Sequence, residues 1–310
     1  MIPIVPDIAV RQLQLDDAEA LLPLVNELLA LAPFSRPMGV ADVRTEILEP
    51  QPPTVMTVRW QDNACFGAWR GGALIGALDA AVGFDAATLE LPEYRPLGLL
   101  RFLALPARAD LVDTVMDQLL AAAVAYWRRQ RVVDLRAFRL STGYPSLQAG
   151  VGVLPGDWGE QFRQLTRCGF QLDERYFCLH RPVERPVEEY VSQAELSLVY
   201  RGRVDDRVYE IYRRAERLAR ARLVRTTSMQ DDRLQPVGLI ADLHVEPNWR
   251  RHGLGRWLLA RMINEATSQG LRELAAFVTM QHYAAMSLLS QYGFEELHYR
   301  GYTLESALKS

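Results

Sequence analysis

A glycine-containing turn with three arginines is the feature of this sequence best suited to chemistry. Its residues are Arg250, Arg251, His252, Gly253, Leu254, Gly255 and Arg256. Gly253 and Gly255 carry no Cβ atom, so a phosphate can approach the main chain at those positions. The arginines add positive charge around the turn. We therefore expect this turn to bind an anion.

The elements on either side of the turn would direct its main-chain N–H groups toward that anion. An apolar run over residues 237–245 predicts a strand, and the amphipathic run from Trp257 to Ala266 predicts a helix that begins at Leu254. The first N–H groups of a helix have no intrahelical acceptor and lie at the positive end of the helix dipole. This arrangement predicts a site for a phosphorylated cofactor.

The spacing Arg-x-x-Gly-x-Gly, with Val245-Glu246-Pro247 before it, resembles motif A of the GNAT acetyltransferase superfamily. A dinucleotide fingerprint would need Gly-x-Gly-x-x-Gly and a P-loop would need Gly-Lys-Ser/Thr, and neither is present. The resemblance implies that the turn binds the pyrophosphate of coenzyme A, with Leu243, Val245 and residues 250–256 contacting the cofactor. The alternative is a turn that joins a strand to a helix and binds nothing.

Residues 281–294 resemble motif B of the same family, with two departures. The positions in register are Ala285, Leu288, Gly293 and Phe294. His282 stands where the family usually has Asn, and it could either hydrogen-bond the pantetheine arm of coenzyme A or be a plain surface histidine. Leu289 stands where the family usually has the Tyr that protonates the departing thiolate. We assign no general acid, and we interpret Tyr283 and Tyr292 as packing residues.

The resemblance also implies how the reaction would proceed. In this family an amine attacks the thioester carbonyl directly, and a main-chain N–H, here that of Val245, meets the developing oxyanion. An amine of pKa about 10 is mostly protonated at neutral pH, so a base is needed. Asp242, His244 and Glu246 alternate on one face of the strand and are the candidates. We choose His244 first because an imidazole titrates near neutrality, the alternative being a solvated histidine.

The first half of the chain repeats the second half in a weaker form. Pro106 and Phe138 are 32 positions apart, and Pro247 and Phe277 are 30 apart, so that the two helix–strand units are nearly equal. We predict an α/β (α+β) protein with two tandem GNAT-like domains, each a mixed, mostly antiparallel central sheet flanked by helices. The expected domains are residues 1–182, a degenerate copy, and residues 183–310, the copy with the acetyl-CoA site.

The first copy lacks the phosphate turn. No glycine follows Pro106, and we expect Asp110 to cap a helix from Leu111 to Arg128, where its carboxylate would repel a pyrophosphate. The first domain is therefore not expected to bind coenzyme A. Its front end looks complete, with a strand over 9–13, helices over 16–31 and 40–48, and a hairpin of 64–69 and 73–81 turning at Gly71-Gly72.

The second copy keeps the turn but is short at its front. About 60 residues separate His180-Arg181-Pro182 from Val245, and they hold a predicted strand over 195–200 and a hairpin of 208–212 with 218–226. No room remains for two early helices, so we expect the first domain or a second subunit to complete the acceptor side. The predicted loops contain acids that could attract a cationic amine or simply belong to solvated turns, namely Asp205, Asp206, Asp231 and Asp232.

Composition excludes several other classes of protein. The 310 residues are 49% hydrophobic with a net charge of −3, and no apolar run approaches the ~18 residues that span a bilayer. Arginines are scattered and matched by 38 acids, so no nucleic-acid footprint stands out. Three widely spaced cysteines indicate neither a disulfide framework nor a metal site. The first seven residues show no targeting pattern, so we expect a cytoplasmic protein.

The resemblance implies an acetyl-CoA-dependent N-acetyltransferase, with the cofactor held by the second copy. The acceptor would be a small-molecule amine or a peptide amine, with no nucleic acid and no membrane as a partner, and a homodimer is possible. The alternative is a non-catalytic protein in which coenzyme A is a structural or regulatory ligand, which the two departures in motif B and the degenerate first copy would fit.

Overall fold

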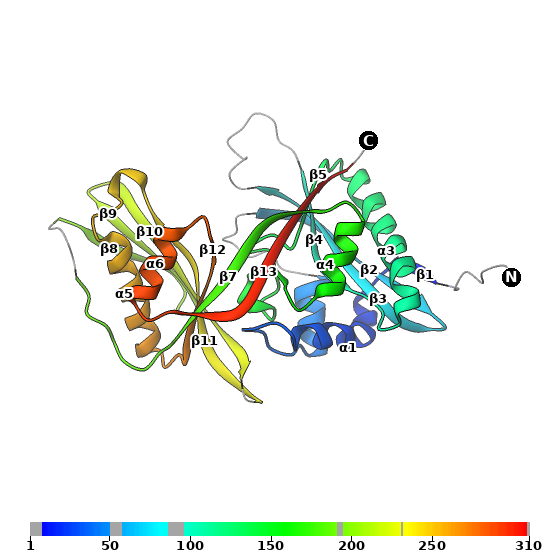
Figure 1. Cartoon of the computed structure of the whole chain (residues 1–310), viewed down its shortest axis with the longest axis horizontal. Helices are drawn as coiled ribbons and strands as arrows, with labels where there is room; N and C mark the ends of the chain where they lie inside the picture. The colour runs from blue at the N-terminus through cyan, green and yellow to red at the C-terminus, as the bar shows by residue number, and fades with distance from the viewer. Residues whose placement is uncertain (1–7, 50–57, 86–95, 191–194, 231, 309–310) are drawn as a thin grey trace. The chain divides into compact units, whose positions relative to one another are not determined.

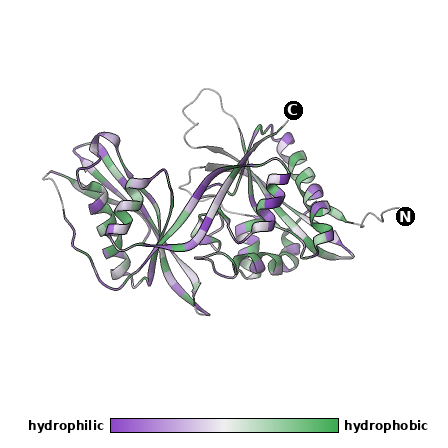
Figure 2. Ribbon diagram, in the orientation of Figure 1, coloured by the Kyte–Doolittle hydropathy of each residue, from purple (hydrophilic) through white to green (hydrophobic). Residues whose placement is uncertain are grey.

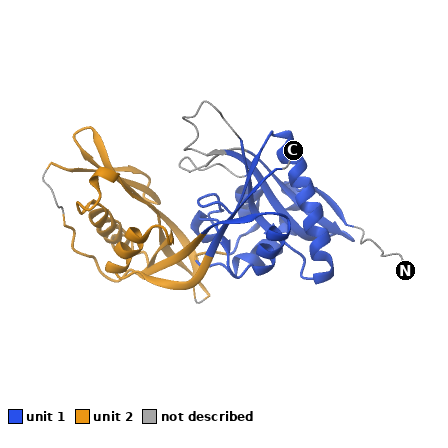
Figure 3. Ribbon diagram, turned by 45° about the horizontal axis from the view of Figure 1, so that its top comes forward, with its two compact units in different colours: residues 1–33, 37–174, 301–310 blue, residues 34–36, 175–300 orange. Residues whose placement is uncertain are grey.

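The computed structural model describes residues 8–49, 58–85, 96–190, 195–230 and 232–308, and its contacts divide the chain into two units (Figure 3). The first unit holds residues 1–33, 37–174 and 301–310, and the second holds residues 34–36 and 175–300. A single cut after residue 182 was expected. The units differ from it because the last ten residues belong to the first unit and residues 175–182 to the second.

The sheet of the first unit has the order β1-β2-β3-β4-β5, followed by the end of β13. All neighbours are antiparallel except β4 and β5. The strands are β1 (Ala9–Gln12), β2 (Val58–Arg70), β3 (Ala73–Asp85), β4 (Leu97–Ala104), β5 (Asp134–Ala137) and β13 (Glu295–Ala307), with the short β6 (Leu154–Pro155) beside β13 (Figure 1). Gly71 and Gly72 both have positive φ, which confirms the hairpin turn predicted there.

The helices of the first unit are η1 (Leu15–Asp17), α1 (Ala18–Leu29), α2 (Val40–Asp42), the π-helical η2 (Val43–Leu48), α3 (Ala109–Arg129), η4 (Gln148–Gly150) and α4 (Gly159–Arg167). Of these, α1, η2, α3 and α4 bury apolar side chains in the core of the unit. Helix α3 buries Leu111, Val115 and Leu119, which are spaced four residues apart and so share one face. Its ribbon carries both apolar and polar residues, as expected of a helix with one buried face (Figure 2).

The start of α3 corrects one sequence expectation. The helix begins at Ala109 with Arg108 as its N-cap residue, so Asp110 lies within the first turn and is not the cap. The Asp110 carboxylate instead accepts hydrogen bonds from the Arg108 guanidinium at 2.6 and 3.1 Å. The pairing was missed because Arg108 lies outside the amphipathic pattern from which the helix was predicted. An acidic residue nevertheless stands at the positive end of the helix dipole.

The sheet of the second unit has the order β7-β12-β11-β10-β9-β8, and only β11 and β12 run parallel. The strands are β7 (Gln171–Pro182), β8 (Ser197–Gly202), β9 (Asp206–Arg213), β10 (Glu216–Gln230), β11 (Arg233–Val245) and β12 (Glu273–Thr279). The helices are η5 (Pro247–Trp249), α5 (Leu254–Ser268) and α6 (Tyr283–Gln291). Among the described residues of this unit, no helix precedes β11, in agreement with the short front predicted above.

Helices α5 and α6 share one hydrophobic core with one face of the second sheet. Leu258, Leu259 and Met262 of α5 are fully buried there, and Leu289 of α6 joins them. Ala221 and Leu223 of β10 belong to this core, whereas Arg220 and Arg222 beside them in sequence are polar.

The two units repeat the same local geometry around their parallel strand pairs. A Cβ added to Gly98 of β4 would lie 2.5 Å from Leu135 Cδ2, and one added to Gly238 of β11 would lie 2.6 Å from Leu274 Cδ2. Each long strand also carries a β-bulge at its antiparallel neighbour, at Arg101 in β4 and at Ala241 in β11. Both pairs of positions are 140 residues apart (238 − 98 and 241 − 101). The internal repeat is therefore present in the fold.

Candidate functional site

Strands β11 and β12 separate near the middle of the second sheet. They pair only over Val237–Leu239 and Glu273–Ala275. The other edge of β11 remains paired with β10 as far as Val245, which lies opposite Ala219. From Ile240 onward, the edge of β11 that faces β12 thus has no ladder partner among the described residues.

Two main-chain N–H groups point to this open edge. The N–H of Glu246 donates to the carbonyl oxygen of Leu218, on the β10 side, at 2.9 Å. Successive N–H groups of a strand point in opposite directions, so those of Val245 and Leu243 point to the side of β12. The predicted oxyanion donor therefore lies where a ligand can reach it.

The turn after β11 has the conformation that its glycine requires. Gly253 has φ +81° and is the residue before α5, which begins at Leu254 as predicted. Trp257 makes the first helical hydrogen bond, to Gly253 O at 3.0 Å. The N–H groups of Leu254, Gly255 and Arg256 have no acceptor among the residues that the structure describes. They form a set of donors at the positive end of a 15-residue helix.

The cationic side chains of the turn take different positions. Arg250 Nε donates to Val245 O at 3.2 Å, which holds that guanidinium beside the open end of β11. Arg256 Nη2 donates to Gln291 Oε1 of α6 at 2.8 Å. His252 Nδ1 lies 2.9 Å from Arg250 O, and Arg251 is exposed with φ +68°. The predicted anion turn therefore has positive charge on both sides of the free N–H groups.

Helix α6 places the motif B residues with mixed results. His282 is the N-cap residue of α6, and its Nδ1 lies 2.9 Å from Thr279 Oγ1, at the end of β12. Leu289 is 2% exposed and belongs to the core, so it brings no polar group to the site. Tyr292 OH donates to Arg256 O at 3.3 Å. Tyr283 is 67% exposed, so its interpretation as a packing residue was wrong.

The polar face of β11 holds the three candidate bases. Asp242, His244 and Glu246 alternate with Leu243 and Val245, which pack against the core beneath α5. The Asp242 carboxylate accepts a hydrogen bond from Arg220 Nε at 2.5 Å. His244 Nε2 lies 3.8 Å from Glu246 Oε2, and both side chains are substantially exposed, at 46% and 39%. Of the three, Asp242 is therefore the one already engaged by a cation.

The same face carries a buried carboxylate that the sequence analysis missed. Glu210 of β9 is 5% exposed and accepts hydrogen bonds from Arg201 at 2.7 Å, Arg217 at 3.1 Å and Tyr212 OH at 3.2 Å. Burial alone would raise the pKa of this carboxyl, but these donors outweigh it and hold the pKa below its usual range. Only the register of β8, β9 and β10 brings the four residues together.

Of the acids that were expected in loops, Asp206 lies in a strand. Asp206 begins β9, and both of its carboxylate oxygens bond the Arg222 guanidinium, at 2.7 and 2.8 Å. Asp205 pairs with the exposed Arg203. Asp231 lies outside the described residues. For Asp206 the loop expectation was wrong, because the hairpin strand starts earlier than its apolar residues indicate.

The described residues were searched for membrane-spanning helices and for groups of metal-binding side chains. None of their helices is both long and apolar enough to cross a membrane. No three of their His, Cys, Asp and Glu side chains are grouped so as to hold a metal ion.

The chain is similar to known proteins in part of its sequence and in its fold. Residues 182–294 match the model of the acetyltransferase (GNAT) family. No curated protein sequence matched the chain. The matched segment runs from the end of β7 to Phe294, and it includes both the turn before α5 and the whole of α6.

Several solved structures share the fold. A tandem GNAT protein from the clavulanic acid biosynthesis pathway superposes with a TM-score of 0.65 at 16% identity, over 98% of this chain and 99% of that chain. A GCN5-related N-acetyltransferase from Sphaerobacter thermophilus gives 0.61 at 10% identity, over 98% and 97%. The glucosamine N-acetyltransferase region of a fungal multi-domain β-N-acetylglucosaminidase gives 0.69 at 14% identity, over 98% of this chain but 38% of that one. The predicted tandem fold is thus confirmed.

Proposed function

We propose that the second unit, in which residues 182–294 match the model of the acetyltransferase (GNAT) family, transfers an acetyl group from acetyl-CoA to a primary amine. This proposal rests on two neighbouring sets of main-chain groups that have no hydrogen-bond partner among the described residues. One is the set of free N–H groups at the start of α5, and the other is the unpaired edge of β11 that leads to it. A long ligand with an anionic end and an amide-containing arm fits both.

The proposed roles follow from these positions. The N–H groups of Leu254, Gly255 and Arg256 would bind the pyrophosphate, with Arg250 and Arg251 supplying charge. The edge of β11 at Leu243 and Val245 would hydrogen-bond the amides of the arm as an added strand would. His282, at the N-terminus of α6, would contact the arm from the other side of the split. Acetyl-CoA supplies an activated thioester.

The chain's own groups would then promote attack by the amine. Val245 N–H would donate to the carbonyl oxygen, where negative charge develops. His244 would accept the proton that the amine loses as its nitrogen bonds to the acetyl carbon and the carbon–sulfur bond breaks. Asp242 is less suited to this role because Arg220 already holds its carboxylate. Its ion pair would instead set the charge of the sheet face that receives the amine.

The departing thiolate does not require a dedicated acid. Leu289 is buried and has no proton to give, and the Tyr292 hydroxyl is donated to Arg256 O. A thiol of pKa about 8.5 is a fair leaving group at neutral pH without full protonation. The loss of the family's tyrosine therefore slows this step and does not prevent it.

Gly255→Asp provides a direct test of the cofactor site. Its Cβ would lie 3.4 Å from Leu288 Cδ2 and 3.6 Å from Val245 Cγ2, which are ordinary contacts, so the variant should fold, whereas its carboxylate would repel a pyrophosphate. We expect calorimetry to show one acetyl-CoA per chain for the natural protein, and at least about tenfold weaker binding, or ~1.4 kcal/mol, for the variant. Gly159→Asp, at a position where an added Cβ would meet open space in the first unit, is the matched control.

Turnover distinguishes the enzyme from the non-catalytic alternative. The protein would be mixed with acetyl-CoA and a panel of primary amines, and release of free thiol would be measured. Amine-dependent release that is lost in Gly255→Asp would support the transferase. Tight binding without thiol release for any amine would favour a structural or regulatory ligand, and absence of binding would overturn the coenzyme A assignment.

A further inference from the structure

His180 of β7 and Glu273 of β12 form a hydrogen-bonded pair in the second unit. The Nδ1 atom of His180 bonds Glu273 Oε1, and Glu273 Oε2 accepts a hydrogen bond from the Gln230 carboxamide. Both carboxylate oxygens are thus engaged, and the Glu273 side chain is only 14% exposed. Residues of three strands, β7, β10 and β12, therefore fix the position of one imidazole.

This pairing determines which ring nitrogen of His180 is available. A carboxylate only accepts hydrogen bonds, so the bonded Nδ1 must carry a proton. In the neutral imidazole, Nε2 then has a free lone pair. Nε2 has no hydrogen-bond partner among the described residues, and the side chain is 26% exposed. A ligand can therefore reach a ring nitrogen that is ready to accept a proton.

The pair lies at the level where β11 and β12 separate. His180 is opposite Ala275 in the ladder of β7 and β12, and Ala275 is opposite Leu239, the last paired residue of β11 on that side. Residues opposite each other in a ladder share a face of the sheet. Leu274 and Ala276 belong to the core of α5 and α6, so Ala275 between them faces away from these helices. His180 therefore lies on that opposite face, at the closed end of the split.

The candidate bases of β11 lie on the same face of the sheet. Leu243 and Val245 pack against the core, and Asp242 and His244 alternate with them. Two histidines of the second unit thus face the same side. His180 is at the closed end of the split, and His244 is on the strand that forms its open edge.

The equivalent place in the first unit holds an ion pair instead. The two copies are offset by 140 residues, so Leu239 corresponds to Leu99 (239 − 99). Leu99 is opposite Arg136 of β5, and Arg136 is opposite Glu305 of β13. Glu305 thus takes the place of His180, and its carboxylate bonds Arg136 at 2.9 Å. Packing alone therefore does not require a histidine here, and the imidazole occurs in the copy that keeps the phosphate turn.

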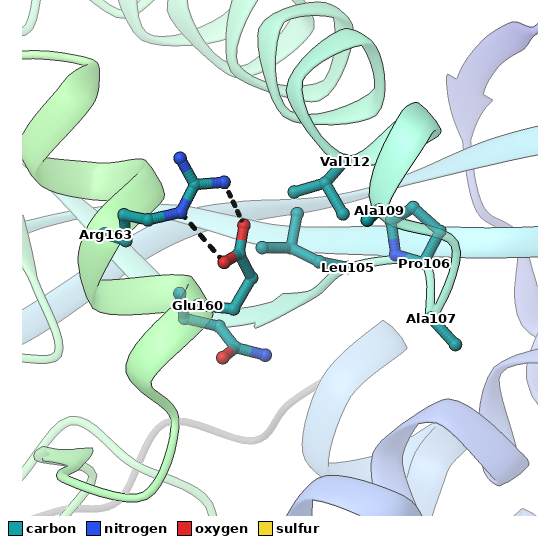
Figure 4. A pocket seen from close by; sticks show the side chains of 8 residues that line it. Leu105, Pro106, Ala107, Ala109, Val112, Glu160 and Arg163 are labelled. Carbon is teal, nitrogen blue, oxygen red and sulfur yellow. Dashed lines mark hydrogen bonds and ion pairs between the residues drawn. The ribbon is translucent and has the colours of Figure 1, made fainter.

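A cavity of the first unit offers no free proton acceptor either. It has a volume of about 330 Å³ and is lined by the turn before α3 and by α4 (Figure 4). Its charged residues, Glu160 and Arg163, bond each other at 2.6 and 2.9 Å, and no histidine is among the residues that line it. Neither of these places in the first unit has a counterpart of the free imidazole.

The proposed cofactor would present its acetyl end to the closed end of the split. In acetyl-CoA, the amides of the arm lie between the pyrophosphate and the thioester. An arm that runs from the turn before α5 along the edge of β11 therefore points its acetyl group toward the level of His180.

The proposed acetyl transfer releases two protons. At neutral pH an amine of pKa about 10 arrives as an ammonium ion, which has to lose one proton before its nitrogen can attack. It loses a second proton as the nitrogen bonds to the acetyl carbon, and the sulfur leaves as a thiolate that takes up neither. His244 can accept only one of the two, so the reaction needs a second proton acceptor.

We propose that His180, held by Glu273, takes the first proton from the ammonium group of the acceptor. The N–H bond breaks with its electron pair left on the nitrogen, and the proton goes to His180 Nε2. The Glu273 carboxylate stabilises the imidazolium that forms, and it is a positioning residue because it acts through His180. The neutral amine then attacks, the carbon–sulfur bond breaks with its electrons on sulfur, and His244 takes the second proton. This inference rests on the proposed function.

The test compares two acceptors of similar shape and different basicity. One is the primary alkylamine of the panel with the fastest thiol release, and the other is its aminooxy analogue, in which oxygen replaces the CH2 group beside the nitrogen. An aminooxy group is neutral at pH 7 and needs no first deprotonation. In the full-length protein, His180→Gln should lower kcat/KM about 10²–10³-fold for the alkylamine and change it little for the aminooxy compound.

Two further variants serve as controls. His298→Gln replaces an exposed histidine of the same unit and should leave both acceptors unaffected. Glu273→Gln should show the selective loss for the alkylamine to a smaller extent, and it replaces His180→Gln in the test if that variant does not fold. Binding of acetyl-CoA, measured by calorimetry, should be unchanged in all three variants.

The outcomes separate this inference from the proposed function. Equal loss for both acceptors, or no loss for either, would overturn the role of His180 in proton transfer. A natural protein that uses alkylamines but none of their aminooxy analogues would also overturn it, because a neutral nucleophile would then not be the reacting form. Absence of thiol release from the natural protein with every amine would overturn the proposed function itself, whatever the variants do.

Discussion

The main-chain N–H of Glu246 donates to Leu218 O at 2.9 Å, and this bond orients the end of β11. Because N–H groups alternate along a strand, the N–H of the preceding residue, Val245, points to the opposite edge, where β12 has already separated. The hydrogen bond of Glu246 to β10 thus determines that the N–H of Val245 faces the gap between β11 and β12. In the proposed reaction that donor meets the oxyanion.

Val245→Pro tests this donor without removing a ladder bond. Proline lacks only the N–H that already faces the open edge, and His244 before it is in extended strand conformation, which proline accepts. We expect kcat to fall about 10²–10³-fold, as when a single oxyanion-hole donor is lost, while the urea midpoint changes little. Steady-state kinetics and urea unfolding would measure the two effects.

His244→Pro is the matched control for that variant. The alternation places the His244 N–H on the β10 side, so this substitution removes a ladder bond and should lower the free energy of unfolding by about 1–3 kcal/mol. If Val245→Pro retained full kcat, the oxyanion role of Val245 would be excluded.

The proposed base is tested by a pair of substitutions on one strand face. His244→Gln removes the proton acceptor and should lower kcat/KM about 10²–10⁴-fold at neutral pH. Asp242→Asn should have a much smaller effect, because the carboxylate is held by Arg220. Steady-state kinetics of the two variants at neutral pH is the decisive measurement. An undiminished kcat/KM in His244→Gln would assign the base elsewhere.

The repeated glycines predict a matched pair of packing effects. Gly238→Ala would bring a Cβ to 2.6 Å from the buried Leu274, and we expect unfolding to become easier by about 1–3 kcal/mol through overpacking. Gly98→Ala should act in the same way against Leu135. Leu274→Val in the Gly238→Ala background removes the nearest of the clashing atoms and leaves the contact with Leu271 Cδ1 at 2.9 Å, so the double variant should recover part of the stability that Gly238→Ala loses. Thermal unfolding of the natural protein, Gly238→Ala and the double variant would show whether the second substitution restores stability.

The sequence predicted the parts of the second unit that depend on local signals. The strand before the turn, the helix start at Leu254 and the hairpin of β9 with β10 were all anticipated, because periodicity and glycine placement are read within a few residues. Helix boundaries shifted slightly, as for α3, where Asp110 proved to be inside the helix. The family match over residues 182–294 covers the segment that holds these motifs.

What the sequence could not supply was pairing between distant segments. A period of two shows which residues share a face of a strand, but not which strand lies beside it or in what register. The ion pair of Asp242 with Arg220 spans 22 positions and depends on a bulge at Ala241. The return of Gly301–Ser310 to the first unit could not be anticipated either, because the C-terminal strand has the pattern of any half-buried strand.

Glu210 predicts how the stability of the second unit depends on pH. The donors around it hold its pKa in the folded protein below that of the unfolded chain, about 4.3 for a glutamate. A depressed carboxyl pKa stabilises the fold above the unfolded value, and this contribution is lost as the pH falls through the folded value. Two of the donors, Arg201 and Arg217, are substantially exposed, so the contribution at pH 7 should be about 1 kcal/mol.

Glu210→Gln therefore has a defined signature. At pH 7 the variant should be less stable than the natural protein by that amount in urea unfolding, because the two guanidinium groups lose a buried anion. Below about pH 4 the two proteins should converge, since the natural carboxyl is then becoming protonated. Glu295 is exposed and has no ion pair among the described residues. Glu295→Gln should therefore have the same free energy of unfolding as the natural protein at both pH values. A stability difference that stayed constant from pH 7 to pH 3 would mean that Glu210 acts through its shape and not its charge.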